Sequence, residues 1–168
     1  MDTNEMKTSE IEVAIGRILK ASGRTLSAAE SCTGGQISHL VTTVAGSSSY
    51  YLGSVTSYAI AVKEKVLGVP ASTIESEGVV STAVASAMAE GVRRLTGSDY
   101  SVATTGFAGP GGGDEHYPEG TVCIAAASEH GTETMVFHSE SDRKTNIEAF
   151  ALAALEFLYE KLIRELND

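Results

Sequence analysis

Three long segments of the chain carry apolar residues at every third or fourth position, which is the spacing of a helix with one buried face. These segments are 9–22, 81–97 and 142–162. Ser9 and Glu12 form a capping-box pattern at the start of the first segment, and Gly23 stands where its helix is expected to end. Ser81 and Asp142 are expected to cap the other two helices. The pattern therefore predicts three long helices with defined ends.

Short apolar or β-branched runs lie between these helices and predict strands. The expected strands are 25–29, 50–60, 100–104, 121–127 and 132–138. Short helices are expected over 34–44 and 62–67, and loops over 75–80 and 106–120. Strands and helices alternate in the first part and a hairpin closes the sheet, which predicts an α/β fold: a three-layer α/β/α sandwich with a mixed sheet. We expect a single domain over 8–165, preceded by a loose tail over 1–7.

The composition narrows the classes of function. The chain has 168 residues and a formal net charge of -10, so it lacks the basic surface that nucleic-acid or membrane-surface binding requires. Two cysteines cannot form a disulfide framework or a four-cysteine metal site, and the four histidines show no metal-ligand spacing. The polar N-terminus lacks the apolar core of a signal peptide. A cytoplasmic protein without a metal is expected.

The sequence Ala-Glu-Ser-Cys-Thr-Gly-Gly at 29–35 is typical of a turn between a buried strand and a helix. Such a turn exposes a side chain at the sheet edge, and the N–H groups of the following helix can bind an anion. Ser31 is therefore a candidate nucleophile. A helix cap formed by Ser31 or Thr33 is the alternative that this segment alone favours. For Cys32, a small buried residue is favoured over a thiol nucleophile.

A second unusual segment, 105–113, places five glycines directly after a predicted strand. Because flexible glycine costs entropy on folding, such a loop often serves to bring a ligand against bare backbone N–H groups. The segment lacks the Gly-Lys-Ser/Thr ending of a P-loop and the Gly-x-Gly-x-x-Gly dinucleotide pattern. A flexible surface loop is the alternative.

Tyr58 and Lys63 lie five residues apart across a predicted strand-to-helix turn, so their side chains can converge. A lysine in a partly dry pocket can act as a base, and a Ser–Lys pair is an alternative to Ser-His-Asp in acyl transfer. A tyrosine can relay a proton or donate to an oxyanion. Arg143 is a candidate clamp for a phosphate or carboxylate. Taken singly, Lys63 and Arg143 are more typical of solvated surface charges, and Tyr58 of a half-buried strand.

Together these segments resemble the C-terminal domain of the competence-damage-inducible CinA proteins, the nicotinamide-nucleotide amidase family. The resemblance extends over 11–158 and follows one order of motifs. These are 29–35, Gly46-Ser47-Ser48, Tyr58 with Lys63, Leu67-Gly68-Val69, Gly78-Val79-Val80-Ser81, Met88-Ala89-Glu90-Gly91, 105–113, Pro118 with Gly120-Thr121-Val122, and Asp142-Arg143. The pieces Glu-Ser-Cys-Thr-Gly-Gly and Ala-Gly-Pro-Gly-Gly-Gly are specific at this separation. Without the N-terminal domain of full-length CinA proteins, the chain is similar to the stand-alone form.

The resemblance implies hydrolysis of the carboxamide of nicotinamide mononucleotide to nicotinic acid mononucleotide and ammonia, a step of pyridine-nucleotide salvage. It implies that Ser31 attacks the amide carbon, that Lys63 takes the serine proton and that Tyr58 assists the transfer. The implied substrate-binding residues are Thr33, Gly34, Gly35, Thr105, Gly106, Gly109, Gly111, Gly112 and Arg143. It also implies a homodimer, and neither a metal nor an organic cofactor.

The chain departs from the pattern of this family at positions around the expected pocket. Ile60 stands where the family usually has asparagine, and 146–149 reads Asn-Ile-Glu-Ala in place of paired arginines and a glutamine. Tyr117 and Glu119 replace a frequent lysine and a frequent valine. These changes make the pocket rim less basic, and each lost phosphate contact costs about 1–3 kcal/mol. Two alternatives therefore stay open: hydrolysis of a different amide, and a catalytically silent homologue that binds a nucleotide or a partner protein.

Overall fold

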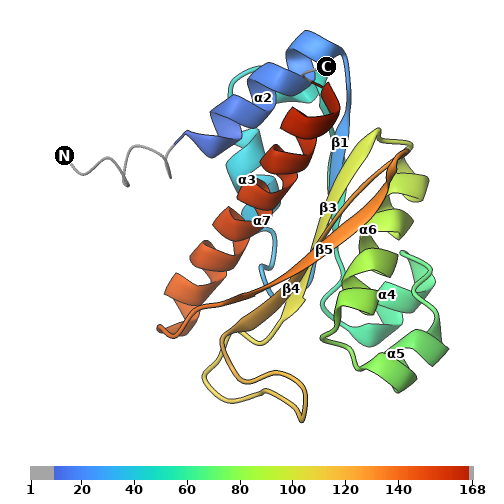
Figure 1. Cartoon of the computed structure of the whole chain (residues 1–168), viewed down its shortest axis with the longest axis vertical. Coiled ribbons are helices and arrows are strands. Elements are labelled where there is room, and N and C mark those ends of the chain that lie inside the picture. Colours follow the sequence, from blue (N-terminus) through green and yellow to red (C-terminus); the bar gives the residue numbers. More distant parts are fainter. Residues whose placement is uncertain (1–9, 167–168) are drawn as a thin grey trace.

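Five strands form one mixed sheet in the order β2-β1-β3-β4-β5, as a computed structural model that describes residues 10–166 shows (Figure 1). The strands are β1 (Leu26–Glu30), β2 (Tyr51–Thr56), β3 (Tyr100–Gly106), β4 (Thr121–Ser128) and β5 (Gly131–His138). Strand β1 is parallel to β2 and β3, and β4 is antiparallel to β3 and β5. The predicted mixed sheet with a closing hairpin is confirmed.

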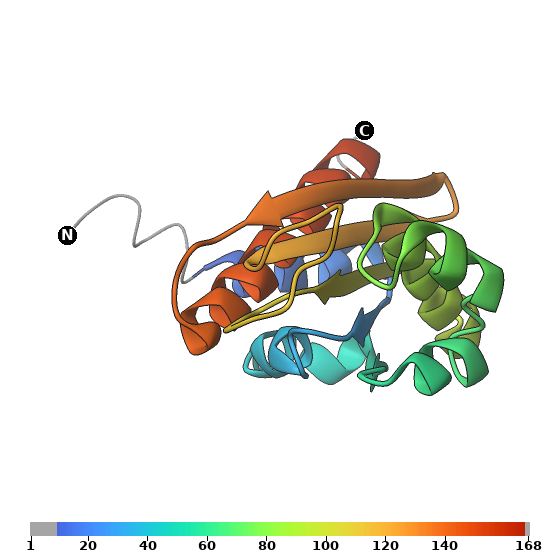
Figure 2. The same ribbon diagram turned by 90° about the horizontal axis from the view of Figure 1, so that it is seen from below.

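Helices cover both faces of the sheet, which gives the predicted three layers (Figure 2). One face carries α2 (Ile11–Ser22), α3 (Gln36–Thr42) and α7 (Arg143–Leu166), and the other carries α4 (Ile60–Lys65), α5 (Ala71–Glu77) and α6 (Thr82–Thr96). Side chains alternate between the two faces along each strand. Ala28 and Val102 pack in the core under α2, α3 and α7, while Ala29 and Ala103 pack under α6.

The ends of the long helices follow the local signals of the sequence. The hydroxyl of Ser81 accepts the N–H of Val84 at 3.1 Å and caps α6. Asp142 accepts the N–H of Thr145 at 2.9 Å at the start of α7. Gly23 ends α2 with a φ of 68°, a conformation that favours glycine. The predicted caps at Ser81 and Asp142 and the predicted stop at Gly23 are confirmed, whereas Ser9 lies outside the described residues, as does the expected tail.

Four segments differ from the prediction. The strand expected over 50–60 ends at Thr56, because the chain turns away from the sheet to enter α4. The first residues of the loop expected over 75–80 belong to α5, which ends at Glu77. This short helix has no buried residue, so its sequence lacks the apolar periodicity by which a helix is predicted. Helix α3 begins at Gln36, after the two glycines. Helix α7 continues to Leu166, past the expected end at Leu162.

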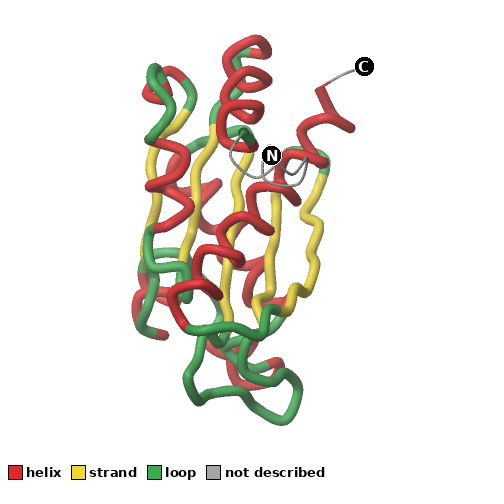
Figure 3. Tube along the Cα trace, turned by 90° about the vertical axis from the view of Figure 1, so that its left-hand side faces the viewer, coloured by secondary structure: helices red, strands yellow, loops and turns green. Residues whose placement is uncertain are grey.

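The strands lie side by side in the sheet (Figure 3). Because β1 is parallel to β2 and β3, the carboxyl ends of these three strands lie at the same end of the sheet. Glu30 pairs with Thr56 on one side and with Thr104 on the other. The N–H of Ser31 donates to the Thr104 carbonyl at 3.1 Å. Ligands of open α/β sheets bind at the carboxyl ends of parallel strands, which is where these residues lie.

Within residues 10–166, no helix is long and apolar enough to cross a membrane.

Candidate active site

A buried carboxylate holds the turn that carries Ser31. Glu30 has no exposed surface and accepts the N–H groups of Ile37 and Ser38 at 2.8 and 3.0 Å. These N–H groups lie in the first turn of α3, where free donors favour a negative charge. Ser31 follows directly and is 8% exposed. Glu30 therefore anchors the turn from beneath, a role that the sequence analysis did not assign to it.

Thr33 points into the protein. Its hydroxyl donates to Glu30 Oε1 at 2.7 Å and lies 2.8 Å from the hydroxyl of Thr104. Gly34 and Gly35 have φ angles of 59° and 107° and lead the chain into α3. None of Thr33, Gly34 and Gly35 lines the cavity in front of Ser31. The structure places these three predicted substrate-binding residues behind Ser31, where they shape the turn.

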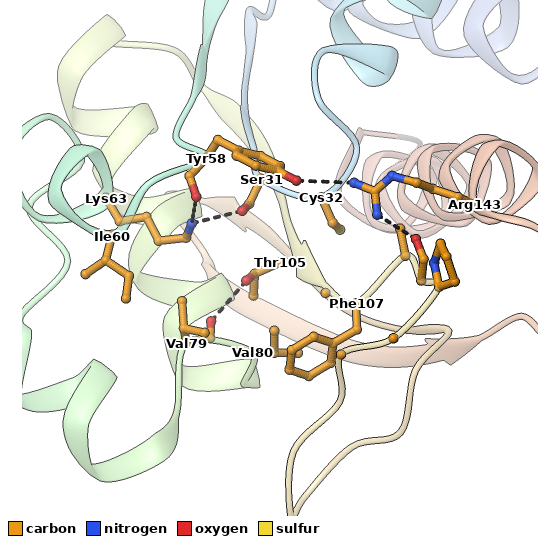
Figure 4. A pocket seen from close by; sticks show the side chains of 16 residues that line it. Ser31, Cys32, Tyr58, Ile60, Lys63, Val79, Val80, Thr105, Phe107 and Arg143 are labelled. Atoms are coloured by element: carbon orange, nitrogen blue, oxygen red, sulfur yellow. Dashed lines mark hydrogen bonds between the residues drawn. The ribbon is translucent and has the colours of Figure 1, made fainter.

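Lys63 reaches Ser31 from α4, the helix that follows β2 (Figure 4). Its Nζ donates to Ser31 Oγ at 2.9 Å and to the carbonyl oxygen of Ser57 at 2.6 Å. A longer contact of 3.4 Å joins it to the carbonyl oxygen of Tyr58. The side chain is 1% exposed, and this burial lowers the pKa of Lys63 from its ordinary value of 10.5. A buried lysine with a lowered pKa beside a serine hydroxyl has the geometry of a nucleophile and its base.

A cavity of about 410 Å³ opens in front of this pair. Nine of the twelve predicted site residues line it: Ser31, Tyr58, Lys63, Thr105, Gly106, Gly109, Gly111, Gly112 and Arg143. Residues that the sequence analysis did not select complete the wall: Cys32, Ile60, Val79, Val80, Phe107, Ala108 and Pro110. Of these, Ile60 was identified as a departure from the family pattern. The apolar members carry no chemical signal in the sequence, because isolated valine or phenylalanine residues are typical of any core.

Arg143 crosses the rim of the cavity opposite Lys63 (Figure 4). Its guanidinium donates to the Gly109 carbonyl at 2.6 Å and to the Tyr58 hydroxyl at 3.2 Å. The Tyr58 side chain is 65% exposed. The structure thus brings Tyr58 and Arg143 together, and the Tyr58 hydroxyl bonds to Arg143 rather than to Lys63 or Ser31.

Thr105 and Gly106 are placed by the packing of β3. The hydroxyl of Thr105 donates to the Val79 carbonyl at 3.0 Å and ties the strand to the segment before α6. A Cβ at Gly106 would lie 2.5 Å from the Thr121 carbonyl oxygen and 3.1 Å from Cys32 Sγ. Only glycine therefore fits between β4 and the turn that carries Ser31 and Cys32.

The thiol of Cys32, next to Ser31, is a poor nucleophile near neutral pH. Burial raises the pKa of the Cys32 thiol to about 12, so the thiolate is scarce near neutral pH. This supports the sequence-based preference for a small buried residue at this position. Among residues 10–166, no three His, Cys, Asp or Glu side chains are grouped to hold a metal ion.

Comparison with known proteins identifies the family. A family profile described as "CinA C-terminal domain" matches residues 8–162. The chain belongs to the CinA family. CinA-like proteins of Desulfosudis oleivorans and Salinibacter ruber are 46% and 47% identical to it, over 91% and 87% of this chain. The chain spans 37% and 35% of the length of these two relatives.

Solved structures of CinA-family proteins share the fold. The competence damage-inducible protein A (ComA) from Klebsiella pneumoniae is 34% identical and superposes with a TM-score of 0.90, covering 94% of this chain and 98% of that one. The competence/damage inducible protein CihA from Agrobacterium tumefaciens is 32% identical with a TM-score of 0.86, covering 96% of each chain. The resemblance drawn from the motifs is confirmed at the level of family and fold.

Proposed function

We propose that the chain is an amidohydrolase that hydrolyses the carboxamide of nicotinamide mononucleotide to nicotinic acid mononucleotide and ammonia. Family membership supports a hydrolase, and the observation that carries the proposal is the contact between Lys63 Nζ and Ser31 Oγ at 2.9 Å. A serine hydroxyl is almost wholly protonated at neutral pH and needs an adjacent base to attack an amide. Lys63 is placed to be that base.

The first step joins Ser31 to the substrate. Burial lowers the pKa of Lys63 and so favours its unprotonated form, and the free amine accepts the Ser31 proton as Oγ attacks the carboxamide carbon. The resulting tetrahedral intermediate carries a negative oxygen. The Cys32 N–H follows the nucleophile directly and donates to no backbone carbonyl within 10–166, so we assign it to this oxyanion. Lys63 then returns the proton to the leaving nitrogen, which departs as ammonia.

The second step frees the acid. Water attacks the ester formed on Ser31 Oγ, and Lys63 accepts one proton from the water. Collapse of this second intermediate returns a proton to Ser31 and releases nicotinic acid mononucleotide. The same residue therefore acts as base and acid in turn.

Tyr58 contributes its backbone to this apparatus, because its carbonyl oxygen is one of three acceptors of Lys63. Its proposed assistance in proton transfer requires the hydroxyl to leave Arg143, to which it bonds at 3.2 Å. Entry of an anionic substrate supplies a reason for that exchange, because a phosphate is a stronger acceptor for the guanidinium than a phenol.

A related carboxamide without a phosphate is the second candidate substrate. Ile60 places an apolar side chain in the cavity wall, and Arg143 already donates to two oxygens of the protein. Both observations leave fewer free hydrogen-bond donors in the cavity for a phosphate, which favours a substrate without one.

The test of the proposed function measures ammonia release from nicotinamide mononucleotide. Wild type is expected to be active, and Ser31→Ala is expected to lose activity by about 10³-fold or more while still binding the mononucleotide. Ser27→Ala is the matched control, because Ser27 is a buried serine of β1, the strand that leads to Ser31, and its hydroxyl lies 2.7 Å from that of Ser98. It is expected to lower stability and to keep turnover.

Two results contradict the proposal. Equal activity of wild type and Ser31→Ala removes Ser31 as the nucleophile. The second contrary result is a wild type that is inactive on the mononucleotide but hydrolyses nicotinamide riboside or a simple aromatic amide. If Ser31→Ala abolishes that hydrolysis, the substrate is the second candidate and not the mononucleotide.

A further inference from the structure

The carboxylate of Glu119 is held against the glycine-rich loop that forms one wall of the cavity. Its Oε2 accepts the N–H of Gly111 at 2.5 Å. A Cβ added at Gly109 would lie 3.0 Å from Cγ, Cδ and Oε1 of Glu119. The missing side chain at Gly109 therefore leaves the space that Glu119 occupies. A bare N–H and a missing Cβ are two features by which such loops receive anionic ligands, and here both serve a carboxylate of the chain itself, on the exposed side of the loop.

Glu119 and Ser31 line different cavities. Glu119 borders a neighbouring cavity of about 400 Å³ together with Glu140 and Asn146. Gly109 and Gly111 border the cavity of Ser31, so the loop carries the carboxylate close to that cavity without placing it inside. Glu119 is solvent-exposed, so water and salt screen its charge, and its repulsion of an anion bound on the other side of the loop is modest.

The positive groups of the cavity offer little to balance that charge. Lys63 and Arg143 are the two lysine or arginine side chains that line it. Lys63 donates to Ser31 and Ser57, and Arg143 donates to the Gly109 carbonyl on the same loop that bonds Glu119. Where the glycine-rich loop borders this cavity, the Arg143 guanidinium already has two protein acceptors, and the Glu119 carboxylate lies against the outer side of the same loop.

We propose that Glu119 is a specificity-determining residue of this site, which weakens the binding of carboxamides that carry a phosphate and leaves the binding of phosphate-free carboxamides unchanged. This inference rests on the proposed function. That function places the amide of the substrate at Ser31 and the remote part of the substrate beside the glycine-rich loop, near Gly109 and Gly111. Neutralising Glu119 is then expected to strengthen the binding of phosphorylated ligands alone.

The test measures binding by titration calorimetry to the Ser31→Ala protein, so that no ligand is consumed. Nicotinamide mononucleotide and nicotinamide riboside are the two probes, because they differ only by the phosphate. Adding Glu119→Gln keeps an acceptor for the Gly111 N–H and removes the charge. We expect it to lower the Kd of the mononucleotide about three- to fivefold and to leave the Kd of the riboside unchanged.

Glu115→Gln is the matched control. Glu115 lies in the same loop, its side chain is 85% exposed, and its Oε1 lies 3.4 Å from Nε2 of the neighbouring His116. It is expected to change neither Kd. Cooperative thermal unfolding of each variant shows that a changed Kd does not reflect loss of the fold.

Equal changes for both ligands with Glu119→Gln, or no change for the mononucleotide, overturn the role of Glu119. If wild type releases no ammonia from the mononucleotide but Glu119→Gln tightens its binding selectively, the reaction is wrong and the role of Glu119 stands. If neither Ser31→Ala nor the double variant binds the mononucleotide, both proposals are wrong.

Discussion

Replacing Lys63 with methionine removes an amine that is 1% exposed and donates to Ser31 Oγ, to Ser57 O and, at 3.4 Å, to Tyr58 O. Methionine has a similar length and keeps the volume filled. A positioned general base contributes roughly 10²–10⁴-fold to a rate, so kcat is expected to fall by about 10³-fold, or ~4 kcal/mol of activation free energy. The Kd of the mononucleotide is expected to change little, because the amine acts on Ser31.

The same substitution has a defined effect on stability. The buried carbonyl of Ser57 loses its donor, which costs about 1–3 kcal/mol. Against this, the variant no longer buries an amine. Because burial lowers the pKa of Lys63 below 10.5, the unfolded chain binds a proton that the folded chain has lost whenever the pH lies between the folded pKa and 10.5. Wild-type stability therefore rises with pH across this window, by up to about 1.4 kcal/mol per pH unit, and levels off above it.

Two measurements test the lowered pKa of Lys63. The kcat/KM of wild type for the mononucleotide should rise with pH as Lys63 loses its proton, and the residual activity of Lys63→Met should lack that limb. Urea unfolding at several alkaline pH values should show wild type gaining stability relative to Lys63→Met as the pH increases. Lys65→Met, an exposed lysine of the same helix, is the control and is expected to behave as wild type in both assays.

The assignment of Lys63 as the base is refuted if Lys63→Met keeps kcat within about threefold of wild type. It is also refuted if wild-type kcat/KM falls with rising pH through the range in which the amine is released. A loss of the same size in Lys65→Met would show that charge near the site, rather than a base, supports turnover.

Two further substitutions test the scaffold by urea unfolding. Glu30→Gln removes one of the two carboxylate oxygens that accept N–H groups at the start of α3, and is expected to cost about 2–3 kcal/mol; a change below about 0.5 kcal/mol would contradict the anchoring role. Gly91→Ala would place a Cβ 2.0 Å from the Leu67 carbonyl oxygen, so it is expected to lower stability by about 2 kcal/mol or more, although alanine favours a helix. Glu90→Ala, an exposed neighbour on α6, is its control and should change stability little.

The sequence predicts the long elements of this fold because their ends carry local signals. The hydroxyl of Ser81 and the carboxylate of Asp142 bond the N–H groups that a helix start leaves free, and these bonds depend only on residues three positions away. Helix α5 has no buried residue, so its sequence carries no apolar face by which a helix could be predicted there. Ser57 and Tyr58 suit a strand as well as a turn, so the sequence does not show that β2 ends at Thr56. In the structure the carbonyl oxygen of Ser57 accepts a hydrogen bond from Lys63 after the chain has left the sheet.

The candidate site shows the same division. Ser31, Lys63 and the glycine loop are chemically conspicuous, and the structure brings them to one cavity. Thr33 is equally conspicuous, but its hydroxyl bonds Glu30 and Thr104 in the interior. The role of Glu30 could not be found from the sequence, because a carboxylate next to a serine gives no sign that it is buried beneath a helix.

The parallel pairing of Glu30 with Thr56 fixes the distance between Ser31 and Lys63. Ser31 follows one strand and Lys63 follows the other, so a slip of two residues in this ladder would displace them by about 6.6 Å and abolish their contact. A collapsed chain with the right helices and the wrong register would look folded by circular dichroism and have no Ser–Lys pair. The rate at which turnover recovers during refolding would therefore report the rate at which β1 and β2 pair in the correct register.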